Sequence, residues 1–316
     1  MLKTIPRIRV LDTPPVTGST VEGLIGDTPL IQLRAVTAGL PAGVQVLAKA
    51  EWFNPGGSIK DRPALNIIRT AIASGQLSPG KTLIDASSGN TGIGYAMIGA
   101  TLGYRVKLVL PANVSAERLA ILRAYGAELI LTDPDRGADG AIEKVRQLVE
   151  AEPDRYFFAD QYGNPANWEA HYYSTGPEIW QQTGGCITHF VAGVGTSGTM
   201  MGIGRFLRAM NPAIRLVSLQ PTRPNSGLEG LKHMPSAIVP PIYDANLADE
   251  NRTVDLQDAH AMARRLTREE GLFVGVSAGA AVSGALSVAR ELEAGVVITV
   301  LPDAGYKYVS KEFWKE

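Results

Sequence analysis

The sequence predicts an α/β protein with two doubly wound domains, each built on a mainly parallel sheet. Its 316 residues exceed the roughly 250–300 residues that a single hydrophobic core usually serves, so two domains are expected. An apolar content of 45% is ordinary for a globular protein. Short apolar segments also alternate with segments of helical periodicity along most of the chain. Strands joined by helical crossovers form parallel sheets that are covered on both faces.

The first half of the chain shows this alternation from residue 44 to residue 150. A strand is predicted at 44–51, and a helix at 61–74, where apolar residues recur at intervals of three and four. Pro63 near the start of this helix and Gly75 just past its end mark its boundaries. The same reasoning predicts strands at 82–86, 106–110 and 128–131 and helices from about Asn90, at 115–125 and at 138–150.

The second half repeats the pattern. It predicts strands at 189–192, 215–219, 272–275 and 296–301, and helices from Gly198, at 256–270 and from Ala278. Residues 272–289 carry no charge, but their glycines, serines and alanines indicate a buried strand and a packed helix instead of a membrane span. We expect residues 1–20 to form an N-terminal arm, 54–160 a small domain, and 21–53 with 161–316 a large domain.

Composition excludes several classes of function. A net charge of −1 without a basic stripe argues against a nucleic-acid partner, and four scattered histidines argue against a metal site. The first 20 residues contain three prolines and no continuous apolar run, so no signal peptide is expected. A single cysteine, Cys186, fits a reducing cytoplasm, and its place before a strand predicts a small buried hydrophobe.

One motif resembles a nucleotide-binding loop but lies in the wrong context. Residues 75–82, GQLSPGKT, have the spacing of a P-loop. A P-loop needs a strand before it and a helix after it, so that the helix N-terminus faces the phosphates. Here a helix precedes and a strand follows, so no nucleotide site is expected.

A second glycine-rich loop indicates phosphate without a dinucleotide. Residues 193–198, GVGTSG, follow a predicted strand and precede a helix. A dinucleotide site would also place an acidic residue at the end of the next strand, which here ends in Gln220 and Pro221. The glycines, the hydroxyls of Thr196 and Ser197, and the helix N-terminus suit a single phosphate monoester.

Three loops then fall at the ends of strands: NPGGSIKDRP (54–63), SSGNTG (87–92) and GTSGT (195–199). Taken alone, Lys60 would be a solvated charge and the serines would be helix caps. Together, a phosphate cradle and a lysine at a helix entrance predict pyridoxal 5′-phosphate, whose aldehyde forms a Schiff base with a lysine amine. The glycines before Lys60 would let the backbone approach this cofactor.

With these loops, the chain closely resembles the cysteine synthase family, the O-acetylserine sulfhydrylases, of the tryptophan synthase β-like fold (fold type II of the pyridoxal phosphate enzymes). Residues 218–244 are similar to the B-type members. The similar motifs cover nearly the whole chain in family order: LIGDTPLIQL (24–33), NPGGSIKDRPA, SSGNTG, QYGNPAN (161–167), GTSGT, GVSAGAA (275–281) and LPDAGYKYVS (301–310).

The resemblance implies roles for individual residues. Lys60 would be the Schiff-base lysine and the acid–base group for the α-proton, and Asn90 would hydrogen-bond the ring 3′-oxygen. Ser277 would face the pyridine nitrogen as a neutral partner, which suits prompt β-elimination. The phosphate would be held by Gly195, Thr196, Ser197, Gly198 and Thr199. The substrate carboxylate would be bound by Ser87, Ser88, Gly89, Thr91 and Gln161.

The resemblance also implies an activity. A pyridoxal phosphate-dependent transferase would replace the acetyl group of O-acetyl-L-serine, or the phospho group of O-phospho-L-serine, by sulfide through an aminoacrylate to give L-cysteine. Carboxylate binding would close the small, mobile domain over the site. Arg223 and Lys232 are candidates to meet a phosphate leaving group, although a solvated basic loop explains them equally well.

Several alternatives stay open at this point. Cystathionine β-synthase, which joins L-serine to homocysteine, shares the same loops. An inactive paralogue could instead act as a binding module, for example for serine acetyltransferase. The family also implies a cytoplasmic homodimer, while no residue identifies the sulfur donor.

Overall fold

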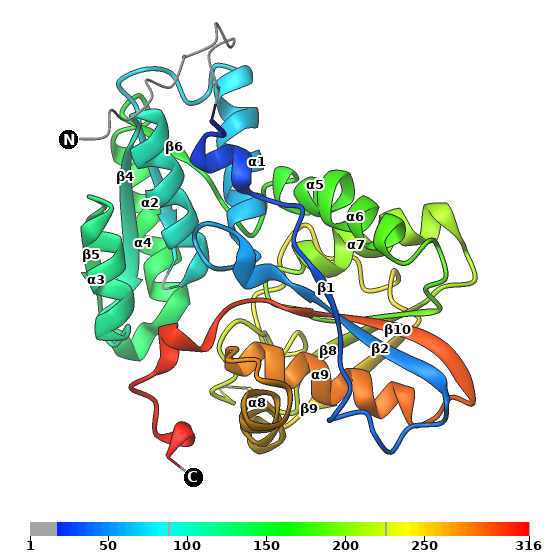
Figure 1. Ribbon diagram of the computed structural model, residues 1–316. Coiled ribbons are helices and arrows are strands. Elements are labelled where there is room, and N and C mark those ends of the chain that lie inside the picture. The colour runs from blue at the N-terminus through cyan, green and yellow to red at the C-terminus, as the bar shows by residue number, and fades with distance from the viewer. Residues whose placement is uncertain (1–17, 88, 225, 316) are drawn as a thin grey trace, which may run out of the picture.

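The computed structural model describes residues 18–87, 89–224 and 226–315. It shows an α/β protein with two separate sheets, as predicted, flanked by helices. The expected arm at 1–20 lies almost entirely outside the described residues. In Figure 1 the smaller sheet and its helices stand on the left, and the larger sheet lies on the right.

The larger sheet has six strands in the order β1-β2-β10-β7-β8-β9. The pair β1 and β2 is antiparallel, and every other neighbouring pair is parallel. The strands are Leu30–Gln32 (β1), Gly43–Ala50 (β2), His189–Gly193 (β7), Arg215–Pro221 (β8), Glu250–Val254 (β9) and Ala294–Leu301 (β10).

The smaller sheet is wholly parallel, with four strands in the order β5-β4-β3-β6. Its strands are Thr82–Ala86 (β3), Arg105–Pro111 (β4), Glu128–Thr132 (β5) and Tyr156–Phe158 (β6). The helices between and around the two sheets are Asp61–Ala73 (α1), Asn90–Leu102 (α2), Ala116–Ala124 (α3), Gly137–Ala151 (α4), Ala166–Ala170 (α5), Gly176–Gln182 (α6), Gly198–Met210 (α7), Leu256–Glu270 (α8) and Val276–Ala289 (α9).

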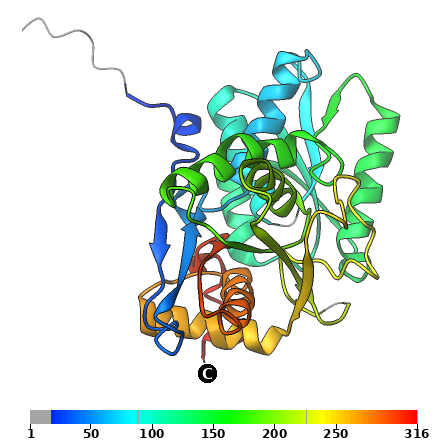
Figure 2. The same ribbon diagram turned by 90° about the vertical axis from the view of Figure 1, so that its right-hand side faces the viewer.

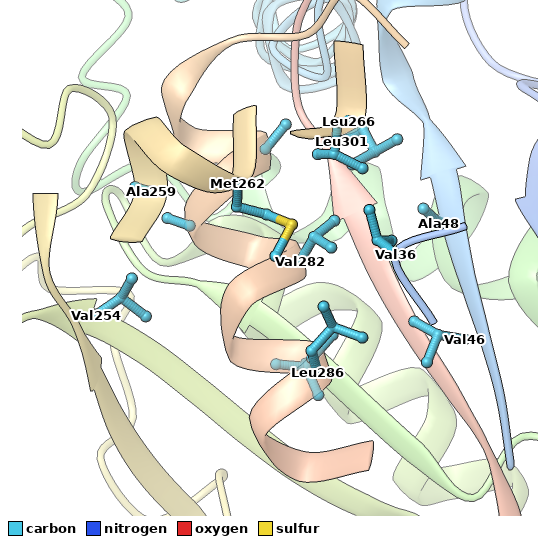
Figure 3. Close-up of a cluster of buried hydrophobic side chains, with 14 of the residues drawn as sticks. Val36, Val46, Ala48, Val254, Ala259, Met262, Leu266, Val282, Leu286 and Leu301 are labelled. Atoms are coloured by element: carbon cyan, nitrogen blue, oxygen red, sulfur yellow. The ribbon is translucent and has the colours of Figure 1, made fainter. Parts of the chain in front are cut away.

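Helices cover both faces of the larger sheet. Neighbouring residues of β7 point to opposite faces, so Val191 packs toward α8 and α9 while Phe190 packs toward α6 and α7. Figures 1 and 2 show α8 and α9 side by side on one face. In Figure 3, Val282 and Leu286 of α9 lie between Met262 of α8 and the sheet. A parallel sheet needs such double cover because both of its faces are apolar.

The structure confirms most of the predicted elements. Seven of the eight predicted strands appear as β2, β3, β4, β5, β7, β8 and β10, with bounds within two residues, and the predicted helices appear as α1, α2, α3, α4, α7, α8 and α9. No helix within the described ranges is long and apolar enough to cross a membrane.

The predicted strand at 272–275 is wrong. Those residues cross from the end of α8 to the start of α9, and only Val274 pairs, through an isolated bridge to Ala304. Cys186 is exposed, so the prediction of a small buried hydrophobe is wrong. The residue lies in the turn that precedes β7. The sequence also gives no sign of β9, an edge strand whose residues, Val254 excepted, are polar.

The topology places several loops at one position. The strands β2 and β10 pair residue by residue from Gly43 with Ala294 to Ala50 with Leu301, so they end at the same edge as β7. The loops after these strands carry Lys60, Asp303 and residues 195–199. In open parallel sheets, ligands bind at the carboxyl ends of strands.

Candidate active site

A cavity of about 540 Å³ lies where the strand ends of the two sheets meet. Of the predicted site residues, Gly198 and Arg223 do not line it, and Ser88 lies outside the described residues. Those that do line it are Lys60, Ser87, Gly89, Asn90, Thr91, Gln161, Gly195, Thr196, Ser197, Thr199, Lys232 and Ser277.

Lys60 is held at the entrance of α1 by contacts with the chain that follows β10. The backbone N–H of Ile59 donates to the carbonyl of Pro302 at 2.8 Å, and Ser58 forms a β-bridge with Asp303. Burial lowers the pKa of Lys60, against the opposing charges of Asp303 and Glu51. A lysine with a lowered pKa is neutral more often, which is the form that acts as a nucleophile or base.

A buried cluster of charges anchors the first turn of α1 beneath Lys60. The Arg62 guanidinium donates to Glu51 at 2.8 and 2.9 Å and to Glu178 at 2.5 and 2.8 Å. Lys49 also pairs with Glu178, at 2.7 Å. The sequence does not reveal this cluster, because Glu178 lies more than 100 positions after the other three residues. Arg62 therefore stabilises the structure around Lys60.

The loop at 195–199 has the features of an anion site. Ser197 has a left-handed backbone, with φ +69°, just before α7. Its buried hydroxyl has no hydrogen-bond partner among the described residues. A Cβ on Gly195 would collide with the carbonyl of Gly230, so only glycine fits there. A free hydroxyl at a helix N-terminus suits one phosphate group, and these residues therefore fit the predicted cofactor.

The SSGNTG loop opens α2 with its polar groups partly engaged. The Ser87 hydroxyl accepts from the backbone N–H of Gly92 at 2.9 Å, which is a capping interaction. Thr91 donates to the side-chain oxygen of Gln161 at 2.8 Å, and Gln161 donates to the carbonyl of Ala86 at 2.8 Å. The structure thus brings Ser87, Gly89, Thr91 and Gln161 to one cavity, with Thr91 and Gln161 bonded to each other.

Asn90 stands at the start of α2 between two buried charged residues. Lys307 donates to the Asn90 side-chain oxygen at 2.7 Å, and the Asn90 side-chain nitrogen donates to Asp303 at 2.7 Å. Tyr308 also donates to Asp303, at 2.6 Å. The motif LPDAGYKYVS contains these partners, yet the sequence does not indicate their proximity to Asn90, more than 200 positions earlier.

Other polar groups complete the cavity wall. Ser277 lies in the first turn of α9, and the Lys232 ammonium stands 4.6 Å from the ring centroid of Tyr162. Burial lowers the pKa of Lys232. Arg118 pairs with Glu229 at 2.5 Å, and Lys311 with the same carboxylate at 3.0 Å. Cations therefore outnumber anions around the cavity, which favours anionic ligands.

The two glycine-rich motifs lie as predicted. Residues 75–82 connect the end of α1 to β3, an order opposite to that of a P-loop. Residues 193–198 connect β7 to α7, and β8 ends at Pro221 without an acidic residue. The geometry supports a phosphate monoester site and no dinucleotide site.

Comparison with protein families decides the assignment of this cavity. The family model described as "Pyridoxal-phosphate dependent enzyme" matches residues 21–303. The chain belongs to this family. The match includes Lys60, Asn90, residues 195–199 and Ser277, and it confirms the predicted cofactor and the fold class.

Curated relatives and solved structures agree with this family. The chain is 50% identical over 302 residues to a cysteine synthase of Aquifex aeolicus, covering 94% of this chain and 92% of that protein. It is 46% identical over 292 residues to cysteine synthase B of Escherichia coli, covering 92% and 95%. The structure of cysteine synthase from Entamoeba histolytica matches with a TM-score of 0.89 at 36% identity, covering 100% of this chain and 94% of that chain.

A further solved structure is that of an O-acetylserine dependent cystathionine beta-synthase from Helicobacter pylori. It matches with a TM-score of 0.89 at 33% identity, covering 95% of this chain and 99% of that chain. The fold is therefore shared by enzymes with different second substrates.

Proposed function

We propose that this protein is a pyridoxal phosphate-dependent cysteine synthase. It replaces the acetyl group of O-acetyl-L-serine, or the phospho group of O-phospho-L-serine, by sulfide to give L-cysteine. The observation that carries the proposal is that Lys60 and the anion site at 195–199 line one cavity together with the SSGNTG loop. The cysteine synthases among the relatives support this choice of reaction.

Different residues of the cavity would bind different parts of the cofactor. When bound, pyridoxal phosphate supplies an aldehyde that reacts with amines and an aromatic ring that withdraws electrons from the α-carbon. The Ser197 hydroxyl and the N-terminus of α7 would hold the phosphate. Asn90 and Ser277 line the same cavity, where the Asn90 amide would bind the ring oxygen and the Ser277 hydroxyl would bind the ring nitrogen.

Lys60 moves the proton of the reaction. Burial lowers the pKa of Lys60, which favours the neutral amine whose Nζ would take the α-proton from the amino-acid substrate. Acetate or phosphate leaves from the β-carbon as an anion. Hydrosulfide then adds to the β-carbon, and Lys60 returns the proton to the α-carbon of the product.

Substrate binding rearranges the SSGNTG loop. The Thr91 hydroxyl donates to the Gln161 side-chain oxygen, so Thr91 must give up this bond before it can donate to a carboxylate. We expect this exchange to draw the small domain (54–160) toward the large domain (21–53 with 161–316). Closure would exclude water from the reacting atoms.

The cavity favours Lys232 over Arg223 as the residue that meets a phosphate leaving group. Lys232 lines the cavity, whereas Arg223 does not. Turnover of O-phosphoserine relative to O-acetylserine should fall in a Lys232→Ala variant and stay unchanged in Arg223→Ala. An equal loss with both donors in Lys232→Ala would contradict the role.

Other features of the proposal come from the family. We propose that the protein is a cytoplasmic homodimer and that serine acetyltransferase is its regulatory partner. The Helicobacter pylori relative favours one alternative activity, the use of homocysteine as second substrate to form cystathionine. Comparing sulfide with homocysteine as acceptor for O-acetyl-L-serine distinguishes the two reactions.

The central test uses the purified wild-type protein with pyridoxal phosphate. We expect a visible absorption band that changes on adding O-acetyl-L-serine, L-cysteine formation with sulfide, and a borohydride-reduced cofactor attached to Lys60. Lys60→Ala should lose the adduct and the activity, while Lys315→Ala, at an exposed side chain, should retain both. A colourless wild-type protein that yields no adduct at Lys60 would overturn the proposal.

A further inference from the structure

Two charged residues from the segment after β10 contact the side-chain amide of Asn90. Lys307 is 1% exposed and Asp303 is fully buried, whereas Asn90 lines the cavity. Asn90 begins α2, beside the smaller sheet, and its two partners follow β10 of the larger sheet. The contacts therefore join the two parts of the molecule next to the cofactor site.

The chemistry of the partners fixes the orientation of the amide. A lysine ammonium only donates hydrogen bonds, so the group facing Lys307 must be the Asn90 oxygen. An ionised carboxylate only accepts, so the group facing Asp303 must be the Asn90 nitrogen. Turning the amide over would place two donors together and two acceptors together, breaking both bonds.

Lys307 is itself held in place. Its Nζ donates to the carbonyl oxygens of Gly56 at 2.9 Å and Gly57 at 3.2 Å, in addition to Asn90. These three acceptors match the three N–H groups of an ammonium. Burial lowers the pKa of Lys307, while the charges of Asp303 and Asp61 oppose this effect.

One hydrogen of the Asn90 nitrogen remains after these bonds are made. The nitrogen carries two hydrogens and Asp303 accepts one of them, so the second is available to the cavity. We infer that Lys307 and Asp303 are positioning residues that orient Asn90 so that it presents a hydrogen-bond donor, and never an acceptor, to the ring oxygen of the cofactor. This inference rests on the proposed function, because it assigns the cofactor's ring to the Asn90 side of the cavity.

A double-mutant cycle on cofactor affinity tests the inference. Lys307→Met should raise the dissociation constant of pyridoxal phosphate about tenfold when Asn90 is present. In an Asn90→Ala background the same change should raise it less than about twofold, because Lys307 acts through Asn90. Equal effects in both backgrounds would show that Lys307 acts only through the loop at Gly56 and Gly57, and would overturn the inference.

Two further variants separate positioning from general stability. Lys307→Arg keeps a donor and should recover most of the affinity and the visible band of the bound cofactor. Lys107→Met removes another buried lysine, bonded to Tyr156 at 2.9 Å away from the cavity, and should leave the dissociation constant unchanged. A loss of affinity in Lys107→Met equal to that in Lys307→Met would contradict a specific role.

A measurement on the wild-type protein remains decisive if Lys307→Met does not fold. With ¹⁵N-labelled asparagine, the side-chain amide of Asn90 is identified by the signals lost in Asn90→Ala. Without cofactor we expect two separate amide-proton signals, one from the hydrogen bonded to Asp303 and one from the hydrogen facing the cavity, and the second should shift strongly on adding pyridoxal phosphate. A single averaged signal for the two protons, as a freely rotating amide gives, would overturn the inference even where the protein binds the cofactor. A wild-type protein without cofactor affinity would instead refute the proposed function.

Discussion

Replacing Glu178 by glutamine tests the buried charge cluster next to Lys60. The Glu178 carboxylate contacts Arg62 at 2.5 and 2.8 Å and Lys49 at 2.7 Å, and its side chain is 12% exposed. Burial alone would raise the pKa of Glu178, but the two cations overcome this effect and lower it from 4.5 to about 2. The variant keeps the shape of the side chain and removes its charge.

The lowered pKa sets the size of the effect. At about 1.4 kcal/mol per pKa unit, a change from 4.5 to about 2 corresponds to about 3 kcal/mol of unfolding free energy at pH 7. Breaking a buried ion pair by removing one partner typically costs 3–5 kcal/mol, in agreement. Because the pKa is lower in the folded state, this contribution is present above pH 4.5 and is lost as the pH falls through 2.

Urea unfolding of the cofactor-free protein measures this difference. We expect Glu178→Gln to be less stable than wild type by about 3 kcal/mol at pH 7, with the gap narrowing steadily below pH 4.5. The control is Glu143→Gln, whose pair with Arg136 has both side chains more than half exposed and should cost less than about 1 kcal/mol. A gap below 1 kcal/mol at pH 7, or one that does not change with pH, would refute the reasoning.

Three further substitutions have outcomes that the structure specifies. Gly195→Ala should weaken pyridoxal phosphate binding roughly tenfold to 100-fold in a spectral titration, since the added carbon meets the backbone carbonyl of Gly230. The control Gly39→Ala, where the added carbon meets open space, should leave binding unchanged. Ser197→Gly should maintain or raise the stability of the cofactor-free protein in urea, because glycine adopts the left-handed backbone without strain. The same change removes the free hydroxyl and should lower cofactor affinity about tenfold. A loss of stability together with the loss of affinity would contradict this separation. Burial raises the pKa of Asp85 to about 7, so its contribution to stability is greatest below pH 4 and is lost as the pH rises through 7. In urea unfolding, the stability advantage of wild type over Asp85→Asn should shrink by roughly 1 kcal/mol per pH unit between pH 5 and pH 7. If the stabilities of the two proteins changed with pH in parallel, this effect of Asp85 would be refuted.

The sequence by itself determined the elements and the chemistry of the site. Periodicity located seven of the sheet strands and their helices, because apolar spacing is a local property of the chain. The motifs around Lys60, Asn90 and residues 195–199 predicted pyridoxal phosphate, because glycines, hydroxyls and a lysine at strand ends carry their chemistry within a few positions.

Only the tertiary structure decided which distant groups meet. The polar edge strand β9 and the crossing at 272–275 depend on neighbouring elements, so local pattern could not identify them. The pairing of Glu178 with Arg62 and the contacts of Lys307 and Asp303 with Asn90 join residues more than 100 positions apart. The four charged residues among them do not stand out in the sequence, because a charge acquires its strength and its role only from the partners and the burial that the fold supplies.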